Sequence, residues 1–389
     1  MEDMKPIYLD SHSTTPVDPR VLESMMPYFT SVFGNASSLD HSYGHDASNA
    51  VQESREKIAG AIHAHSNEII FTSGATESNN LALRGTMTRN KDKGNHMITC
   101  VTEHKAVLDT ARYMESCGIN VTYLPVDEFG WVDPISVSDA ITDSTVMISI
   151  MFANNEIGTI ADVAEIGRIA HESDVLFHTD AAQAVGHLDI DVQKLNIDLM
   201  SFSSHKIYGP KGIGALYARS VMPRVKLDPL LYGGGQEKQI RSGTLNVPGI
   251  VGFAKAVEIA QKEMQSENTK FEKWTKYMLA EFSNAGAKLN GHSTKKLAHN
   301  LNVRFDEVDG KAIINHVSKK LAISAGSACT TQTVEPSHVL LALGLSEKDA
   351  HTAIRIGCNR FNTSEEILVA TKMICLCVED LRKIYGYLQ

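Results

Sequence analysis

The feature that most constrains the fold of this chain is an alternation, between about residues 65 and 220, of short apolar, β-branched runs with helix-like stretches. Such alternation is typical of βαβ units, in which helices cover both faces of a parallel sheet. The runs predict seven strands: Glu68–Thr72, Met97–Val101, Val121–Leu124, Val146–Met151, Val175–His178, Leu199–Phe202 and Gly214–Tyr217. The stretches between them predict helices that include Thr76–Thr88, Lys105–Ser116 and Asp162–Ser173. We therefore expect a doubly wound, mainly parallel α/β domain with its ligand site at the carboxyl ends of the strands.

The pattern changes after residue 236. Pro248–Gln265 and Asn268–Ala285 predict two long amphipathic helices with no strand between them. A second unit of strands and helices is expected from residue 297: strand Asn300–Phe305, helix Gly310–Val317, strand Ala322–Ser324, helix Ser337–Leu343, strand Ala353–Gly357 and a helix from Ser364. Thr363 and Glu366 have the spacing of a capping box at the start of the last helix.

Charge and composition narrow the classes of function. The 389 residues include 46 acidic and 37 basic ones, a formal net charge of −9, so no excess of cations is available for nucleic-acid phosphates or anionic membranes. No stretch approaches the ~18 apolar residues of a membrane span, and the start has no signal-peptide pattern. The six dispersed cysteines indicate a reducing compartment and not a disulfide scaffold. We expect a cytoplasmic protein with no direct nucleic-acid partner and no membrane.

A first group of candidate site residues is Ser73-Gly74-Ala75-Thr76, which follows a predicted strand and begins a predicted helix. The small residues let the backbone approach an anion, and the N–H groups and dipole of a helix N-terminus favour a phosphate. Thr76 adds a hydroxyl donor. On this motif alone an ordinary tight turn is the favoured interpretation.

A second group joins two strand ends. Asp180 follows the strand Val175–His178, and Lys206 follows the strand Leu199–Phe202, with Ser203 and His205 beside it. This combination suits pyridoxal phosphate, because a lysine amine forms a Schiff base, a carboxylate pairs with the ring nitrogen, and hydroxyl and imidazole groups hold a phosphate. A helix-capping aspartate and a solvated lysine are the less favoured alternative, since both residues follow strand ends in register with the phosphate turn.

Other polar residues at strand ends allow two interpretations. His104 suits stacking on a cofactor ring or moving protons, but a lone histidine is as often structural. Asn155, in the run Asn154-Asn155-Glu156, belongs to a site or merely caps a loop.

Among the cysteines, Cys329 is the best candidate nucleophile, because it lies among small polar residues typical of a mobile loop. The other cysteines fall into apolar or structural contexts, with Cys358 ambiguous; those expected to be structural are Cys100, Cys117, Cys375 and Cys377. No set of cysteines and histidines has convincing zinc spacing, so no metal site is expected.

Taken together, these segments resemble the class V, fold type I pyridoxal phosphate enzymes, and specifically the cysteine desulfurases of the NifS and IscS type. The similarity extends along nearly the whole chain and is most specific at residues 72–79, 102–107, 154–158, 201–214, 241–245 and 327–329. It implies a fold type I PLP-dependent transferase with a large α/β domain, residues 16–262. A smaller C-terminal α+β domain, residues 263–389, would be joined by the N-terminal segment 1–15 and carry the catalytic cysteine loop.

The resemblance also implies a role for each cofactor-binding residue. Lys206 would form the Schiff base, and Asp180 would pair with the pyridine nitrogen. Gln183 would contact the ring oxygen, and His104 would stack over the ring and share acid–base work with Lys206. The phosphate would be held by five residues: Ala75, Thr76, Ser203, His205 and, from the other subunit of a homodimer, Thr244.

The same resemblance implies a reaction. Asn155, close to the cofactor, and Arg355 would bind the carboxylate of L-cysteine, and Arg355 can do so bidentately. Cys329 would attack the substrate sulfur, so that L-alanine leaves and a persulfide stays on the enzyme. The stretch Thr330–Pro336 resembles the extended loop that delivers persulfide to a sulfur-acceptor or iron–sulfur scaffold protein, and hence to iron–sulfur clusters, thio-cofactors or tRNA thiolation.

Two alternatives stay open at this point. A selenocysteine lyase or another class V enzyme would keep the lysine and aspartate without needing a cysteine at Cys329. A non-catalytic sulfur-trafficking partner would need none of these residues. One departure from the family is Ser11-His12-Ser13, which stands where a more Asn- or Ala-rich stretch is usual.

Overall fold

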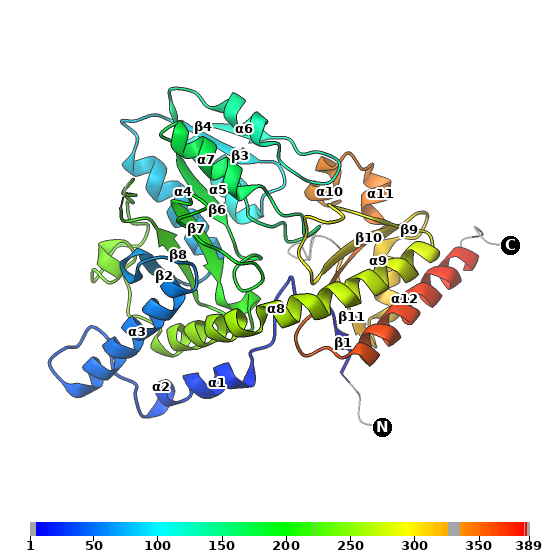
Figure 1. Ribbon diagram of the computed structural model, residues 1–389, viewed down its shortest axis with the longest axis horizontal. Coiled ribbons are helices and arrows are strands. Elements are labelled where there is room, and N and C mark those ends of the chain that lie inside the picture. The colour runs from blue at the N-terminus through cyan, green and yellow to red at the C-terminus, as the bar shows by residue number, and fades with distance from the viewer. Residues whose placement is uncertain (1–4, 222, 326–334, 385, 387–389) are drawn as a thin grey trace.

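The computed structural model describes residues 5–221, 223–325, 335–384 and 386 (Figure 1). Its largest sheet has seven strands in the order β2-β8-β7-β6-β5-β3-β4. They are β2 (Ile69–Thr72), β3 (His96–Cys100), β4 (Asn120–Leu124), β5 (Thr145–Ser149), β6 (Leu176–Asp180), β7 (Leu199–Ser203) and β8 (Gly214–Ala218). Only β8 runs antiparallel to its neighbours β2 and β7 within this described sheet. The seven predicted strands and the mainly parallel sheet are confirmed.

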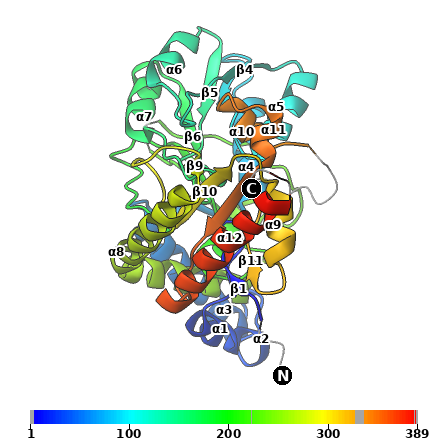
Figure 2. The same cartoon turned by 90° about the vertical axis from the view of Figure 1, so that its right-hand side faces the viewer.

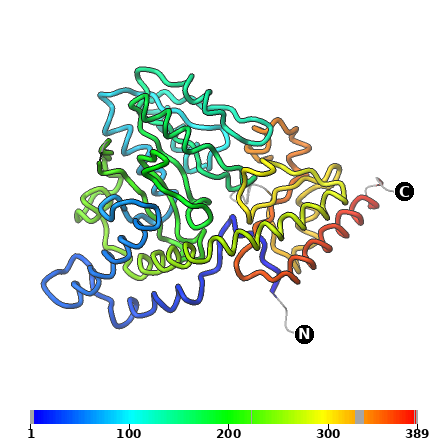
Figure 3. Tube along the Cα trace, in the orientation of Figure 1, coloured from blue at the N-terminus to red at the C-terminus, as the bar shows by residue number. Residues whose placement is uncertain are grey.

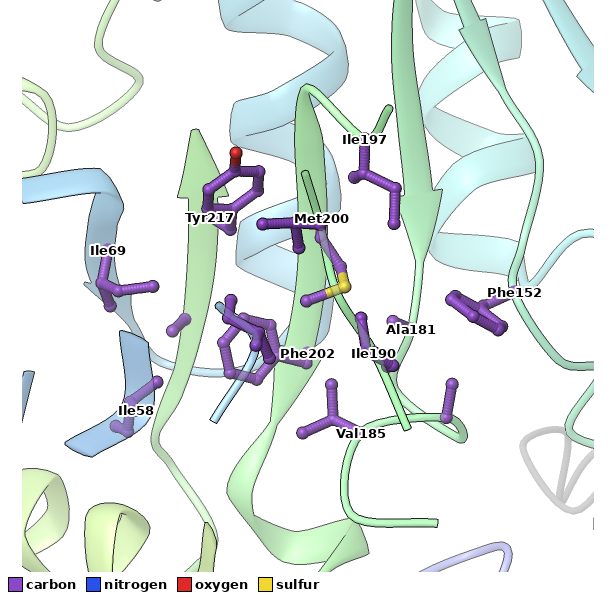
Figure 4. Packing of buried hydrophobic residues seen from close by; sticks show 14 of the residues in the cluster. Ile58, Ile69, Phe152, Ala181, Val185, Ile190, Ile197, Met200, Phe202 and Tyr217 are labelled. Atoms are coloured by element: carbon purple, nitrogen blue, oxygen red, sulfur yellow. The ribbon is translucent and has the colours of Figure 1, made fainter. Parts of the chain in front are cut away.

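Strand side chains alternate between two apolar clusters, one on each face of this sheet. On β7, Met200 and Phe202 enter the cluster that also contains Ile58 of helix α3 (Ser42–Gly60). Leu199 enters the cluster that contains Leu83 of helix α4 (Ala75–Arg89). Figure 4 shows part of the first cluster, with Met200 and Phe202 lying together with Ile58 and Tyr217. Because successive strand residues point to opposite faces, burial on both faces requires the continuous apolar runs seen in the sequence.

The helices around this sheet include the three that the sequence predicts. They are α1 (Pro19–Met25), α2 (Pro27–Thr30), α3 (Ser42–Gly60), α4 (Ala75–Arg89), α5 (Lys105–Ser116), α6 (Pro134–Ala140) and α7 (Val163–Glu172). Short 3₁₀ turns cover Ser66–Glu68, Ser204–Lys206 and Glu237–Gln239. Aspartates at Asp18, Asp133 and Asp162 cap α1, α6 and α7 by accepting backbone N–H groups of the first turn. Among the residues that the structure describes, no helix is long and apolar enough to cross a membrane.

The two long helices predicted from the sequence form one helix, α8 (Val247–Asn284), so that prediction is wrong. No glycine or proline interrupts the segment between them, and Ser266 and Asn268 cost a helix less than about 1 kcal/mol each. Contacts also hold this segment helical: Glu267 is buried in an ion pair with Arg360, and Asn268 Nδ2 donates to His187 O at 2.8 Å. Tertiary packing therefore overrides the weak local break.

The first half of α8 packs in the cluster of the large sheet, and the second half packs in a cluster of its own with the C-terminal elements. Figures 1 and 3 show α8 passing from the one to the other. We therefore propose that the domain boundary lies within this helix, where it is expected from the sequence, between residues 262 and 263.

The C-terminal elements form a three-stranded antiparallel sheet and a two-stranded parallel pair. The strands are β9 (Ala287–Leu289), β10 (Asn300–Phe305) and β12 (Ala353–Gly357), and the pair is β1 (Ile7–Tyr8) with β11 (Leu321–Ala322). The helices are α9 (Gly310–Val317), α10 (His338–Ala342), α11 (Glu347–His351) and α12 (Ser364–Ile384). In the view of Figure 2, α9 and α12 face the reader.

Local signals placed the start of α12 correctly. Thr363 N donates to Glu366 Oε2 at 3.1 Å, and Glu366 N donates to Thr363 Oγ1 at 3.2 Å. The capping box is therefore confirmed. The predicted strand Ala322–Ser324 is displaced toward the N-terminus, because Ser324 pairs with Arg355 of β12 instead of with β1.

Candidate active site

A cavity of about 550 Å³ opens at the carboxyl ends of β6 and β7. Residues from both units of the fold line it, together with the N-terminal segment. The predicted site residues among them are Ala75, Thr76, His104, Asn155, Asp180, Gln183, Ser203, His205, Lys206 and Arg355. The sheet topology explains the convergence, since the carboxyl ends of parallel neighbours such as β6 and β7 meet at one edge.

Two predicted residues are not placed in this cavity. Thr244 is exposed and does not line it, and its expected role concerns the site of a second subunit. Cys329 lies outside the described residues, in the range 326–334. The roles of both therefore stay predictions.

Asp180 and Lys206 stand at the ends of neighbouring strands. Asp180 is the last residue of β6, and its carboxylate accepts from Asn79 Nδ2 at 2.6 Å and from Ala182 N at 2.9 Å. Lys206 follows β7 in a 3₁₀ turn, and its Nζ donates to the backbone oxygens of His12 and Ser13, the latter at 2.9 Å. A carboxylate of fixed orientation and a lysine amine thus face the same cavity.

The turn that holds Lys206 depends on close backbone approach. A Cβ atom at Gly209 would lie 1.9 Å from Ser204 Oγ, and Gly212 has a φ of +77°. Thr15 ties this turn to the N-terminal segment: its Oγ1 donates to His205 O at 3.0 Å and accepts from Tyr208 N at 2.8 Å. Close approach at Gly209 and a positive φ at Gly212 therefore explain why glycines follow the lysine in this turn.

The anion-binding motif lies at the start of α4, which is 15 residues long. Gly74 is the N-cap with a φ of +154°, and a Cβ added at Gly214 would lie 2.6 Å from Gly74 Cα. Only glycines let β8 and this turn approach so closely. The unpaired N–H groups of the first turn and the side chains of Thr76 and Ser203 are available to an anion in the cavity.

Burial controls the charge of two groups beside this site. Burial, followed by the nearby charges of Lys206 and Lys211, lowers the pKa of His205 to about 4, so its imidazole is neutral at pH 7. Burial raises the pKa of Glu103 well above its ordinary value, although Met151 N donates to its Oε1 at 2.6 Å. Glu103 precedes His104, which caps α5 by accepting Ala106 N at 3.1 Å through Nδ1.

Arg355 and Asn155 lie next to each other although they come from different units of the fold. Arg355 is only 2% exposed, and its guanidinium donates to Asn155 O at 2.9 Å. It also donates to Asp10 Oδ1 at 3.0 Å and to Ser13 Oγ at 2.8 Å. These contacts fix the orientation of a planar cation that lines the cavity.

Two of the cysteines have surroundings that the sequence did not predict. Cys358 is fully buried in the cluster around α12, and burial raises its pKa to about 12, so it is a core residue. Cys117 is exposed at the C-cap of α5, so burial gives no support to the expectation that it is structural.

Sequence reasoning missed several residues that line the cavity. Asn79 lies three residues after Thr76 on the same helix, and that spacing could have found it. His338 opens α10, and its Nε2 donates to Glu103 O at 3.0 Å. His12 appeared only as a departure in the N-terminal segment, yet it lines the cavity.

The donor set of the cavity fits pyridoxal phosphate. The cofactor offers an aldehyde, a ring nitrogen and a phosphate, and the cavity offers a lysine amine, an oriented carboxylate and a helix N-terminus with hydroxyl and imidazole groups. Lys206, Asp180 and the residues around Thr76 would hold these three parts respectively.

Comparisons with known proteins show the family of this chain. The family model described as aminotransferase class-V matches residues 7–369. The chain is 49% identical over 385 residues to the cysteine desulfurase IscS of Rickettsia massiliae and 50% identical to that of Rickettsia africae, covering 97% of this chain and 92% of each relative.

Two solved structures are similar along most of the chain. A NifS-like protein has a TM-score of 0.89 at 36% identity and covers 99% of this chain and 100% of its own. SspA in complex with cysteine has a TM-score of 0.79 at 39% identity and covers 92% and 100% respectively.

Proposed function

The chain belongs to the aminotransferase class-V family, and from that membership we propose how its residues remove sulfur from L-cysteine. The protein is a pyridoxal-phosphate-dependent cysteine desulfurase, which converts L-cysteine to L-alanine and retains the sulfur for transfer. The observation that carries the assignment of residues is that Lys206, Asp180 and Arg355 line one cavity.

Bound pyridoxal phosphate supplies an electron-withdrawing ring that makes the Cα–H bond of an attached amino acid acidic. Asp180 would hold the ring nitrogen in its protonated form through a carboxylate that Asn79 and Ala182 orient. Lys206 accepts the Cα proton at Nζ and later returns a proton, and His104 is the second acid–base group beside the cavity.

Arg355 and Asn155 bind the substrate carboxylate. The guanidinium has a fixed orientation, because its Nη2 donates to Asp10 Oδ1 and to Ser13 Oγ, and its planar shape suits a carboxylate. Fixing the carboxylate and the amine of the substrate at two points determines which bond at Cα faces Lys206.

Cys329 accepts the sulfur. Its thiolate attacks the sulfur atom of the substrate, the C–S bond breaks, and the proton lost by the thiol is returned to the carbon skeleton. The thiol and L-cysteine thereby become a persulfide on Cys329 and L-alanine. The persulfide sulfur then passes to an acceptor protein, such as an iron–sulfur scaffold.

We further propose that the active unit is a homodimer in which Thr244 completes the phosphate site of the other subunit. Arg241, in the same segment, is anchored near the phosphate turn by its 2.8 Å ion pair with Glu77. The nearby Tyr232 and, on another element, Phe33 are 83% and 64% exposed, as expected of side chains that a partner would cover. The dispersed cysteines support a cytoplasmic location.

Two measurements test the proposed function. Borohydride reduction of the yellow protein followed by peptide mapping should attach the cofactor to Lys206, and attachment to Lys211, which also lines the cavity, would overturn the assignment. Incubation with L-cysteine and a reductant should release alanine and sulfide in equal amounts. A strong preference for selenocysteine over cysteine would favour the lyase alternative instead.

A further inference from the structure

His12, in the N-terminal segment that departs from the family, lines the cavity and contacts several of its residues. It is 1% exposed, and its backbone oxygen accepts from both Lys206 Nζ and Gln183 Nε2, the latter at 3.1 Å. Its imidazole contacts two further groups: Nδ1 lies 2.9 Å from Gln183 Oε1, and Nε2 lies 3.1 Å from Asn300 Nδ2.

These contacts determine which nitrogen of His12 carries the proton. The Asn300 amide is oriented by the backbone oxygen of Glu156, which accepts from Nδ2 at 3.2 Å. Because the same Nδ2 can only donate, His12 Nε2 must be the acceptor, and the proton of a neutral ring must be on Nδ1. His12 therefore donates from Nδ1 to Gln183 Oε1.

Two contacts with His12, one from its ring and one to its backbone oxygen, fix the orientation of Gln183. Its amide oxygen accepts from the His12 ring, so its amide nitrogen carries two N–H groups at a defined place. One of them donates to His12 O. The other is left for the cavity, which Gln183 lines.

The surroundings keep the ring neutral and in place. His12 stacks on His299 at 4.6 Å between ring centroids, and His299 stacks on His187 at 4.0 Å. Burial, followed by the positive charge of Arg355, lowers the pKa of His12 well below its ordinary value, and Lys206 acts in the same direction. An uncharged, Nδ1-protonated imidazole is thus the form at neutral pH.

We propose that His12 is a positioning residue, which fixes the Gln183 amide so that its second N–H points to the ring oxygen of pyridoxal phosphate. This inference rests on the proposed function, because it assumes that the cofactor occupies the cavity. A donor at that place stabilises negative charge on the ring oxygen, and it thereby lowers the pH at which the bound nitrogen of Lys206 loses its proton.

The test compares three variants in the full-length protein. His12→Phe keeps a stacking ring but loses the donor, and His12→Asn keeps an amide N–H near the place of Nδ1. His299→Phe is the matched control, because it makes the same change one ring away, at a residue that does not line the cavity and whose Nδ1 has no hydrogen-bond partner among the described residues.

The readouts are pyridoxal phosphate affinity and the pH midpoint of the visible absorbance of the bound cofactor. His12→Phe should bind the cofactor about tenfold more weakly and raise the midpoint by about one pH unit. His12→Asn should restore most of both values, and His299→Phe should match the wild type. A wild-type midpoint in folded His12→Phe would overturn the proposal.

A measurement on the unmutated protein covers the case in which His12→Phe does not fold. ¹⁵N-histidine NMR spectra, assigned with His12→Asn, should show His12 as the neutral Nδ1–H tautomer between pH 6 and 8. An Nε2–H tautomer would overturn the proposal. Failure of the wild type to bind pyridoxal phosphate would instead refute the proposed function.

Discussion

Replacing Arg355 by lysine keeps a positive charge in the cavity and changes only the geometry of its donors. In the structure, the Arg355 guanidinium donates to Asn155 O at 2.9 Å, Asp10 Oδ1 at 3.0 Å and Ser13 Oγ at 2.8 Å. A lysine ammonium has three donors on a single nitrogen, so it cannot maintain these separated contacts and also meet both oxygens of a carboxylate.

The size of the effect follows from the hydrogen bond that the substitution removes. A hydrogen bond to a charged group contributes about 1.5–3 kcal/mol, and each 1.36 kcal/mol is a factor of ten. Loss of one of the two bonds to the substrate carboxylate should therefore lower kcat/KM by roughly 10- to 150-fold. The change should be mainly a rise in KM, because a carboxylate contact made equally in the ground and transition states is uniform binding.

Steady-state kinetics with L-cysteine, following alanine, is the assay. Asp10→Asn separates the two functions of the arginine, because it removes the ion-pair partner of Arg355 but leaves the guanidinium. Arg304→Lys on the neighbouring strand β10 is the matched control, since Arg304 does not line the cavity. Arg304→Lys should have the KM of the wild type. If folded Arg355→Lys also keeps a KM within twofold of the wild type, Arg355 does not bind the substrate carboxylate.

Three further predictions concern other parts of the molecule. Cys329→Ser should keep the yellow cofactor and its spectral response to L-cysteine but form neither persulfide nor alanine at the normal rate, whereas Cys117→Ser, an exposed cysteine, should be fully active; an active Cys329→Ser would exclude it as the sulfur acceptor. Mixing inactive Lys206→Ala with weakened Thr244→Ala subunits should restore activity, because one site of each hybrid dimer then has both groups; no gain despite proven subunit exchange would contradict a shared site. His178 is fully buried, and burial lowers its pKa to about 3, so the native state binds fewer protons than the unfolded state below pH 6.5 and stability falls as the pH drops. Urea unfolding should show that the wild type loses roughly 2–3 kcal/mol more between pH 7.5 and 4.5 than His178→Asn; equal losses would refute this linkage.

The elements of the large sheet could be predicted from the sequence because their signals are local. Each strand is a short, mainly apolar run, and all except the edge strand β4 are buried on two faces, so run length and composition identify them. Asp180, Lys206 and the turn before Thr76 could be assigned to one site for a related reason, since all three follow strand ends and parallel strands end at one edge.

Other features depend on contacts between distant residues, which no local pattern contains. The joining of two expected helices into α8 rests on Glu267 and Arg360, 93 positions apart. The adjacency of Arg355 and Asn155 joins residues 200 positions apart, through the hydrogen bond from the Arg355 guanidinium to Asn155 O.

His12 shows the limit most clearly. As a sequence feature it is one polar residue in an extended segment, and nothing nearby in the chain indicates its partners. Its proton position is determined by Asn300 and Glu156, and its effect is exerted on Gln183, so the relevant hydrogen bonds span 144 to 288 positions. Local composition therefore determined which chemistry the chain can carry, whereas the tertiary structure decided which side chains orient it, because hydrogen-bond direction is set only when donor and acceptor are brought within about 3 Å of each other.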